Sequence, residues 1–364
     1  MNKNLNLTAL GLALVLTGCK SIGPNTITRD RFDYGGAVAD SWKSQMLLNL
    51  VKIRYGDAPV FLDVGQIVAG YSFQRSLSAS ATGNTYNNNS PANTVAQGTF
   101  GLTASGSYND SPTITYTPLT GERFARQLMT PIPPVAIMNV IQAGFPVNEV
   151  FRLSVQAVNG IDNRRVKGLY VQPAEPEFYS LLHCLQRIQD SGDFGVQSRE
   201  TNGMEVLEML LRPHPVAAVE RSYQDLTSML GLEAGSRTFR VAYGALPSND
   251  KEIAILSRSI YEVLTDISSS IAVPEAHVSE RRVGPTAEPD LGSDGPIPPL
   301  VRIVESKERP ADAYVAVPYA GYWFSIDNKD LPSKKMFSFI MLLFTFVERG
   351  NNAATPVLTI PTTR

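Results

Sequence analysis

The sequence predicts an α+β fold, with a mixed or antiparallel sheet packed against several amphipathic helices and a long projecting β-hairpin. Apolar residues recur at helical spacing in segments such as 177–189 and 216–230, which indicates helices with one buried face. Residues 99–108 alternate between apolar and small polar types, which is the period of a strand. Hydrophobic residues make up 43% of the 364-residue chain, enough for one large core or two ordinary ones.

The first predicted elements are a helix, a strand and the hairpin. Trp42, Met46, Leu50 and Ile53 give the segment 41–55 one apolar helical face. Residues 60–73 are predicted as a strand. The hairpin follows over 71–118, and the asparagine-rich sequence NTYNNNSPANT is expected at its tip.

Helices and strands alternate irregularly in the rest of the body, which we expect to extend from 41 to 283. Periodicity and end signals predict helices over 120–129, 134–144, 177–189 and 216–230, and strands over 150–158 and 237–246. A last helix is predicted over 249–267, because Asn249 and Glu252 resemble a capping box before it.

The C-terminal part begins at a segment with few residues to bury. Residues 284–299 contain three glycines and five prolines, which predicts a mobile loop. Residues 300–364 then contain strands, a very apolar helix and a last strand at 356–361. We expect this strand-helix-strand unit to complete the body.

Charge and cysteine content limit the function. The formal net charge is −2, so the chain lacks the basic surface that nucleic-acid binding requires, and no nucleic-acid partner is expected. Only one of the two cysteines, Cys184, lies in the body, so no disulfide is expected within it.

The N-terminus has the layout of a secretory signal peptide. Lys3 precedes a short apolar run that ends at Thr17 and Gly18, directly before Cys19. The four residues from Leu16 to Cys19, LTGC, resemble the lipobox of bacterial lipoproteins. This resemblance implies that residues 1–18 are removed and that Cys19 is acylated.

The same resemblance implies a location. Lipoproteins with an aspartate directly after the modified cysteine are retained in the inner membrane, and Lys20 and Ser21 lack this signal. We therefore expect an outer-membrane protein that is bound to the membrane through acyl chains on Cys19. Residues 19–40 would form a lipidated tether, with the body in the periplasm.

Further stretches also resemble known lipoproteins. The sequences PTITYTPLTGERF, YGALPSND, EIAILSRS and YWFSIDNKDLPSKKMFSFIMLLFTF are similar to blocks in a group of uncharacterised Gram-negative lipoproteins. The similarity covers most of the chain and implies the same anchor, but it brings no activity with it.

Catalytic, cofactor and metal motifs are missing from the sequence. It contains no HExxH, GxSxG, GxGxxG or phosphate-loop pattern. His183 and Cys184 are adjacent on a predicted helix, where they diverge by about 100° and do not face each other. His277 has Glu275 and Glu280 nearby, a weak pattern for a metal. We expect no catalytic residue, no metal site and no cofactor.

An aromatic run provides the candidate binding residues. Tyr322 and Trp323 stand close before Asp327, and such aromatic side chains stack on sugar rings, lie at membrane interfaces or fill cores. Asp327 and Asp330 are three residues apart before a helix, a spacing that suits a carboxylate pair or a helix cap. We expect Asp330 to be a cap.

Three functions follow from these features. The favoured one is a non-enzymatic outer-membrane lipoprotein that binds an envelope protein as a scaffold, assembly factor or accessory subunit. The first alternative is a homo-oligomeric outer-membrane pore component in which each subunit contributes its hairpin. The second alternative is a periplasmic glycan-binding protein or hydrolase that uses Tyr322, Trp323 and Asp327.

Overall fold

The computed structural model describes residues 22–68, 71–84, 97–110, 113–168, 170–201, 204–213, 215–292 and 295–348. Cys19, the expected hairpin tip at 85–96, His214 and the expected strand at 356–361 lie outside these residues. The protein has an α+β fold, as the sequence predicts. It divides into a hairpin unit, Leu62–Leu119, and a main unit formed by the chain up to Phe61 and from Thr120 onward.

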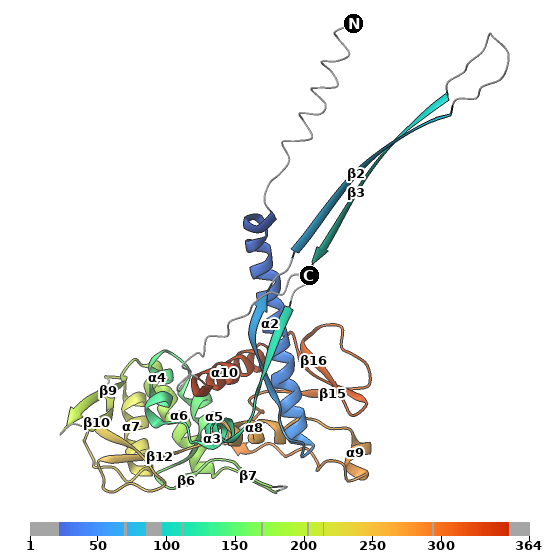
Figure 1. Ribbon diagram of the computed structural model, residues 1–364. Helices are drawn as coiled ribbons and strands as arrows, with labels where there is room; N and C mark the ends of the chain where they lie inside the picture. Colours follow the sequence, from blue (N-terminus) through green and yellow to red (C-terminus); the bar gives the residue numbers. More distant parts are fainter. Residues whose placement is uncertain are drawn as a thin grey trace, which may run out of the picture. The chain divides into compact units, whose positions relative to one another are not determined.

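A six-stranded sheet lies in the main unit, in the order β6-β5-β12-β11-β10-β9 (Figure 1). Its strands are β5 (Val155–Val158), β6 (Ile161–Asp162), β9 (Phe194–Thr201), β10 (Met204–Leu211), β11 (Thr238–Tyr243) and β12 (Glu252–Ser257). Neighbouring strands are antiparallel except β11 and β12, which are parallel. Phe239 and Val241 of β11 are buried between exposed neighbours, so one face of the sheet is covered there.

Four helices pack in succession beside this sheet. They are α4 (Pro134–Gln142), α5 (Val147–Ser154), α6 (Pro176–Asp190) and α7 (Ala217–Met229). The predicted stripe of α6 is confirmed, because its buried residues are Phe178, Leu181, Leu182, Leu185 and Ile188. Gly231 follows α7 with a φ of 63°, a left-handed conformation that glycine adopts readily at helix ends.

A second sheet of the main unit has three antiparallel strands, in the order β15-β17-β16. These are β15 (Val304–Ser306), β16 (Ala313–Tyr319) and β17 (Tyr322–Asp327). Ala320 and Gly321 join β16 to β17, and both have positive φ, as a two-residue type I′ turn requires.

Further helices belong to the main unit. They are α2 (Ile22–Arg54), α3 (Glu122–Met129), α8 (Ile260–Ser269), α9 (Glu275–Ser279) and α10 (Leu331–Glu348). α2 contacts α8 and β16, while Phe339 of α10 lies 4.7 Å from Phe145 between ring centres. Among the described residues, no helix combines the length and apolar character needed to cross a membrane.

The helix predicted over 249–267 is wrong in its first half, which is β12. This strand is buried at almost every position because it lies inside the sheet, so apolar residues occupy both of its faces and mimic a helical pattern. The capping box that opens α8 is formed by Ser259 and Glu262, ten residues beyond the predicted pair Asn249 and Glu252.

Three other segments differ from the sequence prediction. The strand predicted over 150–158 is α5 as far as Ser154, and only Val155–Val158 is extended. The strands β9 and β10 were not predicted. The tether expected over 19–40 is helical from Ile22 as part of α2, where Pro24 stands in the first turn and costs no helical hydrogen bond.

The hairpin unit contains the predicted pair of long strands. β2 (Tyr71–Asn84) and β3 (Gln97–Asp110) have 14 residues each and pair antiparallel from Tyr71 opposite Asp110 to Asn84 opposite Gln97. Ser76 Oγ lies 2.5 Å from Ser105 Oγ across the pair. A shorter pair is formed by β1 (Phe61–Val68) and β4 (Thr113–Leu119). Projection of the hairpin and its role in an oligomeric pore stay predictions.

Candidate functional site

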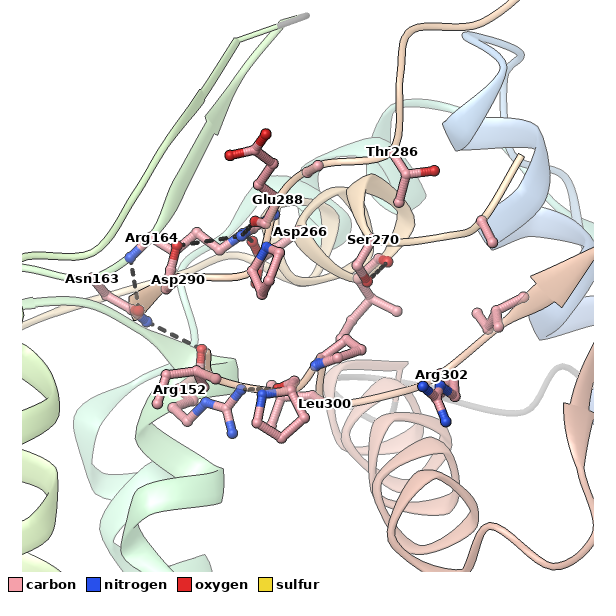
Figure 2. Close-up of a pocket in the computed structure, with 18 of the residues that line it drawn as sticks. Arg152, Asn163, Arg164, Asp266, Ser270, Thr286, Glu288, Asp290, Leu300 and Arg302 are labelled. Carbon is pink, nitrogen blue, oxygen red and sulfur yellow. Dashed lines mark hydrogen bonds and ion pairs between the residues drawn. The ribbon is translucent and has the colours of Figure 1, made fainter. Parts of the chain in front are cut away.

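A cavity of about 400 Å³ lies in the main unit, between the end of α5, helix α8 and the segment 284–304 (Figure 2). Its lining combines apolar side chains with six charged residues. The charged residues are Arg152, Arg164, Arg302, Asp266, Glu288 and Asp290. A preformed hollow with apolar walls and a few polar groups is the usual form of a small-ligand site.

Described residues of the segment 284–299 form one wall, and the mobility expected from its composition stays a prediction. Ala287 N donates to Ser269 O at 3.1 Å, and Ile297 N donates to Asp290 O at 2.7 Å. The short strands β13 (Leu291–Gly292) and β14 (Gly295–Pro296) also pair. Backbone hydrogen bonds therefore hold a segment that has few apolar side chains, which composition alone does not reveal.

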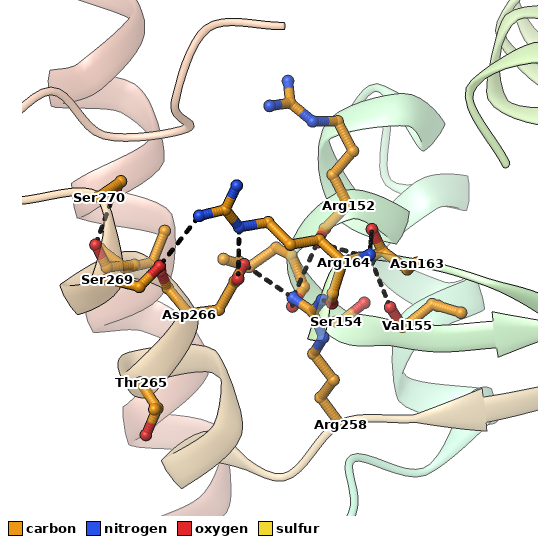
Figure 3. A network of polar contacts seen from close by, with 12 residues as sticks. Arg152, Ser154, Val155, Asn163, Arg164, Arg258, Thr265, Asp266, Ser269 and Ser270 are labelled. Carbon is orange, nitrogen blue, oxygen red and sulfur yellow. Dashed lines mark hydrogen bonds and ion pairs between the residues drawn. The ribbon is translucent and has the colours of Figure 1, made fainter. Parts of the chain in front are cut away.

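Arg164 connects this wall to α8. Its Nε lies 3.3 Å from Asp266 Oδ1, and its Nη1 lies 3.3 Å from Asp290 Oδ1. Nη1 also donates to Glu288 O at 2.8 Å, and Nη2 donates to Ser269 Oγ at 3.2 Å (Figures 2 and 3). One guanidinium thus contacts two carboxylates and orders the backbone beside them.

Arg258 lies behind the cavity wall and is only 3% exposed. Its Nη1 donates to Asp266 Oδ2 at 3.0 Å and to the carbonyls of Arg152 and Leu153 at 3.1 and 3.3 Å. Its Nη2 donates to the carbonyl of Arg164. Four acceptors surround this buried cation, which compensates for its removal from water. Arg258 therefore holds α5, Arg164 and α8 together.

Tyr179 ties helix α6 to the same network. Its hydroxyl donates to Asp290 Oδ2 at 2.6 Å, and Asp290 is 6% exposed. Burial and this hydrogen bond raise the pKa of Tyr179 above its usual range. The phenol is therefore a neutral donor at physiological pH, and it fixes the Asp290 carboxylate from the side opposite Arg164.

Arg152 and Arg302 have fewer hydrogen-bond and ion-pair partners for their charged side chains than Arg164 and Arg258 have. The Arg152 Nη2 donates to Pro298 O at 2.7 Å, and in Figure 3 the guanidinium points away from the Asp266 network. Burial lowers the pKa of Arg152, although nearby carboxylates such as Asp266 and Asp290 oppose the shift. Arg302 is exposed, and Figure 2 shows it on the other side of Leu300 from Arg152.

No family model matches the chain, and neither the curated proteins nor the solved structures contain a match.

The binding candidates from the sequence do not line this cavity. The Tyr322 ring lies 5.1 Å from the His277 ring, and the Arg309 guanidinium lies 5.5 Å from the centre of the Trp323 ring. Asp327 Oδ1 accepts from Lys329 N at 2.8 Å, which is a local turn contact. The structure thus places these residues in the second sheet and in the turn before α10.

Asp330 has the predicted capping role. Its Oδ1 accepts from Ser333 N at 3.1 Å, and its Oδ2 accepts from Ser333 Oγ at 2.8 Å, at the start of α10. Ser333 Oγ also accepts from Arg302 N at 2.8 Å. This helix cap therefore positions the backbone of a cavity arginine.

The histidine and cysteine candidates take ordinary places. His277 is 4% exposed, and its Nδ1 lies 2.7 Å from the Tyr55 hydroxyl. His183 is exposed and Cys184 half-buried, in agreement with their predicted divergence on α6. Among the described residues, no three His, Cys, Asp or Glu side chains are arranged to hold a metal ion.

The cavity arginines were missed by the sequence analysis. They stand at the ends of buried elements, as Arg152 does in the last turn of α5. The one local sign of this network in the sequence is Arg258, a charged residue between the apolar stretches of β12 and α8. A charge in such a place requires buried acceptors, but the sequence does not say which segments supply them.

We expect the variant Tyr179→Phe to lose about 1–3 kcal/mol of unfolding free energy at pH 8, because Asp290 Oδ2 loses its donor. The variant also tests the raised pKa of Tyr179. The folded protein keeps this phenol proton at pH values where the unfolded chain loses it, so the stabilisation is complete below about pH 10 and declines above it.

Tyr319 also contributes stability that declines at alkaline pH, because burial and the hydrogen bond to Asp57 raise its pKa to about 12. Urea unfolding between pH 8 and 11 should show a smaller alkaline loss for Tyr179→Phe than for the unchanged protein. The exposed Tyr243 provides the matched control, Tyr243→Phe. Equal alkaline losses in all three proteins would contradict the role assigned to Tyr179.

Proposed function

We propose that this protein is a lipid-anchored outer-membrane lipoprotein that acts without catalysis, by holding an envelope component as a scaffold, assembly factor or accessory subunit. The observation that carries the binding role is the preformed cavity of the main unit. The lipobox-like sequence that ends at Cys19 supports the anchor.

The cavity suits binding because its wall is already organised. Arg164 and Tyr179 hold Asp290, while Arg164 and Arg258 hold Asp266. Binding to a site whose side chains are already ordered avoids the entropy cost of ordering them. The two wall carboxylates are engaged in these contacts, which favours a structural role for them over a proton-transfer role.

A photo-crosslinker at Leu300 tests this proposal. Leu300 lines the cavity between Arg152 and Arg302 in Figure 2. We expect p-benzoylphenylalanine at this position to crosslink an envelope component when cells are irradiated. The matched control is the same residue at Leu246, which is 72% exposed and does not line the cavity. Equal adducts at both positions, or none at Leu300, would count against a binding role for the cavity.

A further inference from the structure

We infer that the cavity binds an organic oxyanion, a carboxylate or phosphate joined to a small apolar group, with Arg152 and Arg302 holding the oxyanion. This inference rests on the proposed binding function and adds the class of ligand. It depends on the uneven pairing of the charged lining residues, the place of the two arginines in the lining and the apolar side chains around them.

The formal charges of the six charged lining residues sum to zero, but these residues are not evenly paired with one another. Asp266 and Asp290 are balanced by Arg164 and by Arg258 behind the wall. The lining then still contains Arg152 and Arg302 against a single further carboxylate, that of the exposed Glu288. Within the described residues no ion pair joins Arg152 or Arg302 to a carboxylate, and two unpaired guanidiniums at one cavity favour an anionic ligand.

Arg152 has donors to spare. Its Nη2 donates to Pro298 O, and within the described residues the guanidinium forms no ion pair with a carboxylate. A guanidinium has five N–H donors in a planar fork that matches carboxylate and phosphate oxygens. The contact with Pro298 holds the side chain at the cavity while the other donors can receive an oxyanion.

Arg302 is positioned from its backbone. Its N–H donates to Ser333 Oγ, and Ser333 is in turn held by the cap residue Asp330. The side chain is exposed and lines the same cavity as Arg152. Its guanidinium can therefore supply further N–H donors to an oxyanion bound in this cavity.

The apolar residues of the lining favour a ligand that has an apolar group. Ile267, Ala272, Ile297, Leu300 and Ile303 line the cavity, and Pro289 and Pro299 add further apolar surface. The volume of about 400 Å³ admits a small organic molecule or the end of a larger one. A bare inorganic anion would leave these walls without contact.

Ligand-observed NMR titration of the full-length protein in detergent tests the inference. The probes are benzoate, phenyl phosphate, benzyl alcohol and inorganic phosphate. We expect benzoate or phenyl phosphate to bind at least tenfold more tightly than both benzyl alcohol and inorganic phosphate. The stronger of the two organic anions identifies a carboxylate or a phosphate as the natural group.

Matched variants show whether the two arginines hold the anion. We expect Arg152→Gln and Arg302→Gln each to weaken binding of the better anion about tenfold, and Arg152→Lys to weaken it less than Arg152→Gln. The control Arg212→Gln removes the same charge from an exposed residue outside the cavity and should leave affinity unchanged. If Arg152→Gln impairs folding, Arg302→Gln still tests the inference, because Arg302 is exposed.

Three results would overturn the inference. They are equal binding of benzyl alcohol and the organic anions, equal binding of inorganic phosphate and phenyl phosphate, or equal affinities in Arg302→Gln and Arg212→Gln. The crosslinking result at Leu300 is independent of these. An arginine-dependent affinity without a crosslinked envelope component would contradict the proposed function and leave the ligand class in place.

Discussion

We expect the Arg258→Met variant to lose about 3–5 kcal/mol of unfolding free energy, because it removes one of the two arginines that compensate the buried Asp266 and takes a donor from three backbone carbonyls. Arg258 is 3% exposed, and its guanidinium donates to Asp266 and to three backbone carbonyls. Methionine fills part of the space but donates to none of these acceptors. Urea unfolding followed by circular dichroism measures the difference.

The control for this variant is Arg212→Met, which removes the same side chain from an exposed position. Its unfolding free energy should stay within about 0.5 kcal/mol of the unchanged protein. A loss of less than about 1 kcal/mol in Arg258→Met would show that the buried network does not hold α5, Arg164 and α8 together.

We expect Cys19→Ser to lose acylation completely and to move the protein from the membrane fraction to the soluble fraction. Each buried CH₂ of an acyl chain contributes about 0.8 kcal/mol to membrane binding, so two or three chains give a stable anchor and none gives no anchor. Metabolic labelling with radioactive palmitate and fractionation of the cells measure both effects.

Cys184→Ser is the matched control for the anchor, because Cys184 is the free, half-buried thiol in the described part of the chain. Burial raises the pKa of this thiol, which lowers its reactivity at neutral pH. This variant should keep its palmitate label and its membrane location. Labelled Cys19→Ser protein, or unlabelled Cys184→Ser protein, would disprove the assignment of the anchor to Cys19.

Helices with one buried face were predictable from the sequence. The stripe from Phe178 to Ile188 is buried as its spacing predicts, since a helix at the surface of a core alternates apolar and polar residues with a period of 3.6. The period-two pattern of β3 likewise matched an observed strand. Both patterns are local, so neighbouring residues alone reveal them.

Elements buried on both faces were not predictable in this way. β12 is buried at almost every position and its sequence predicts a helix, because the period of a strand is lost inside the sheet. The composition of the segment 284–299 predicts a mobile loop but does not reveal contacts such as the hydrogen bond from Ala287 N to Ser269 O. Such contacts depend on partners that local composition does not name.

The candidate site was less predictable than the fold. The aromatic run drew attention to Trp323 and Tyr322, whose rings lie against Arg309 and His277. The cavity instead depends on arginines from separate segments, and Arg152 and Arg302 meet at the same cavity although 150 positions separate them in the sequence. Only the folded chain brings them together.

Crosslinking from Leu300 in an Arg152→Gln/Arg302→Gln background tests the central claim most directly. It asks whether the two arginines hold a natural envelope component in the cavity of the intact protein in its own membrane. We predict that p-benzoylphenylalanine at Leu300 gives an adduct in the otherwise unchanged protein and at least tenfold less in the double variant. An adduct of equal yield in both backgrounds would contradict the claim.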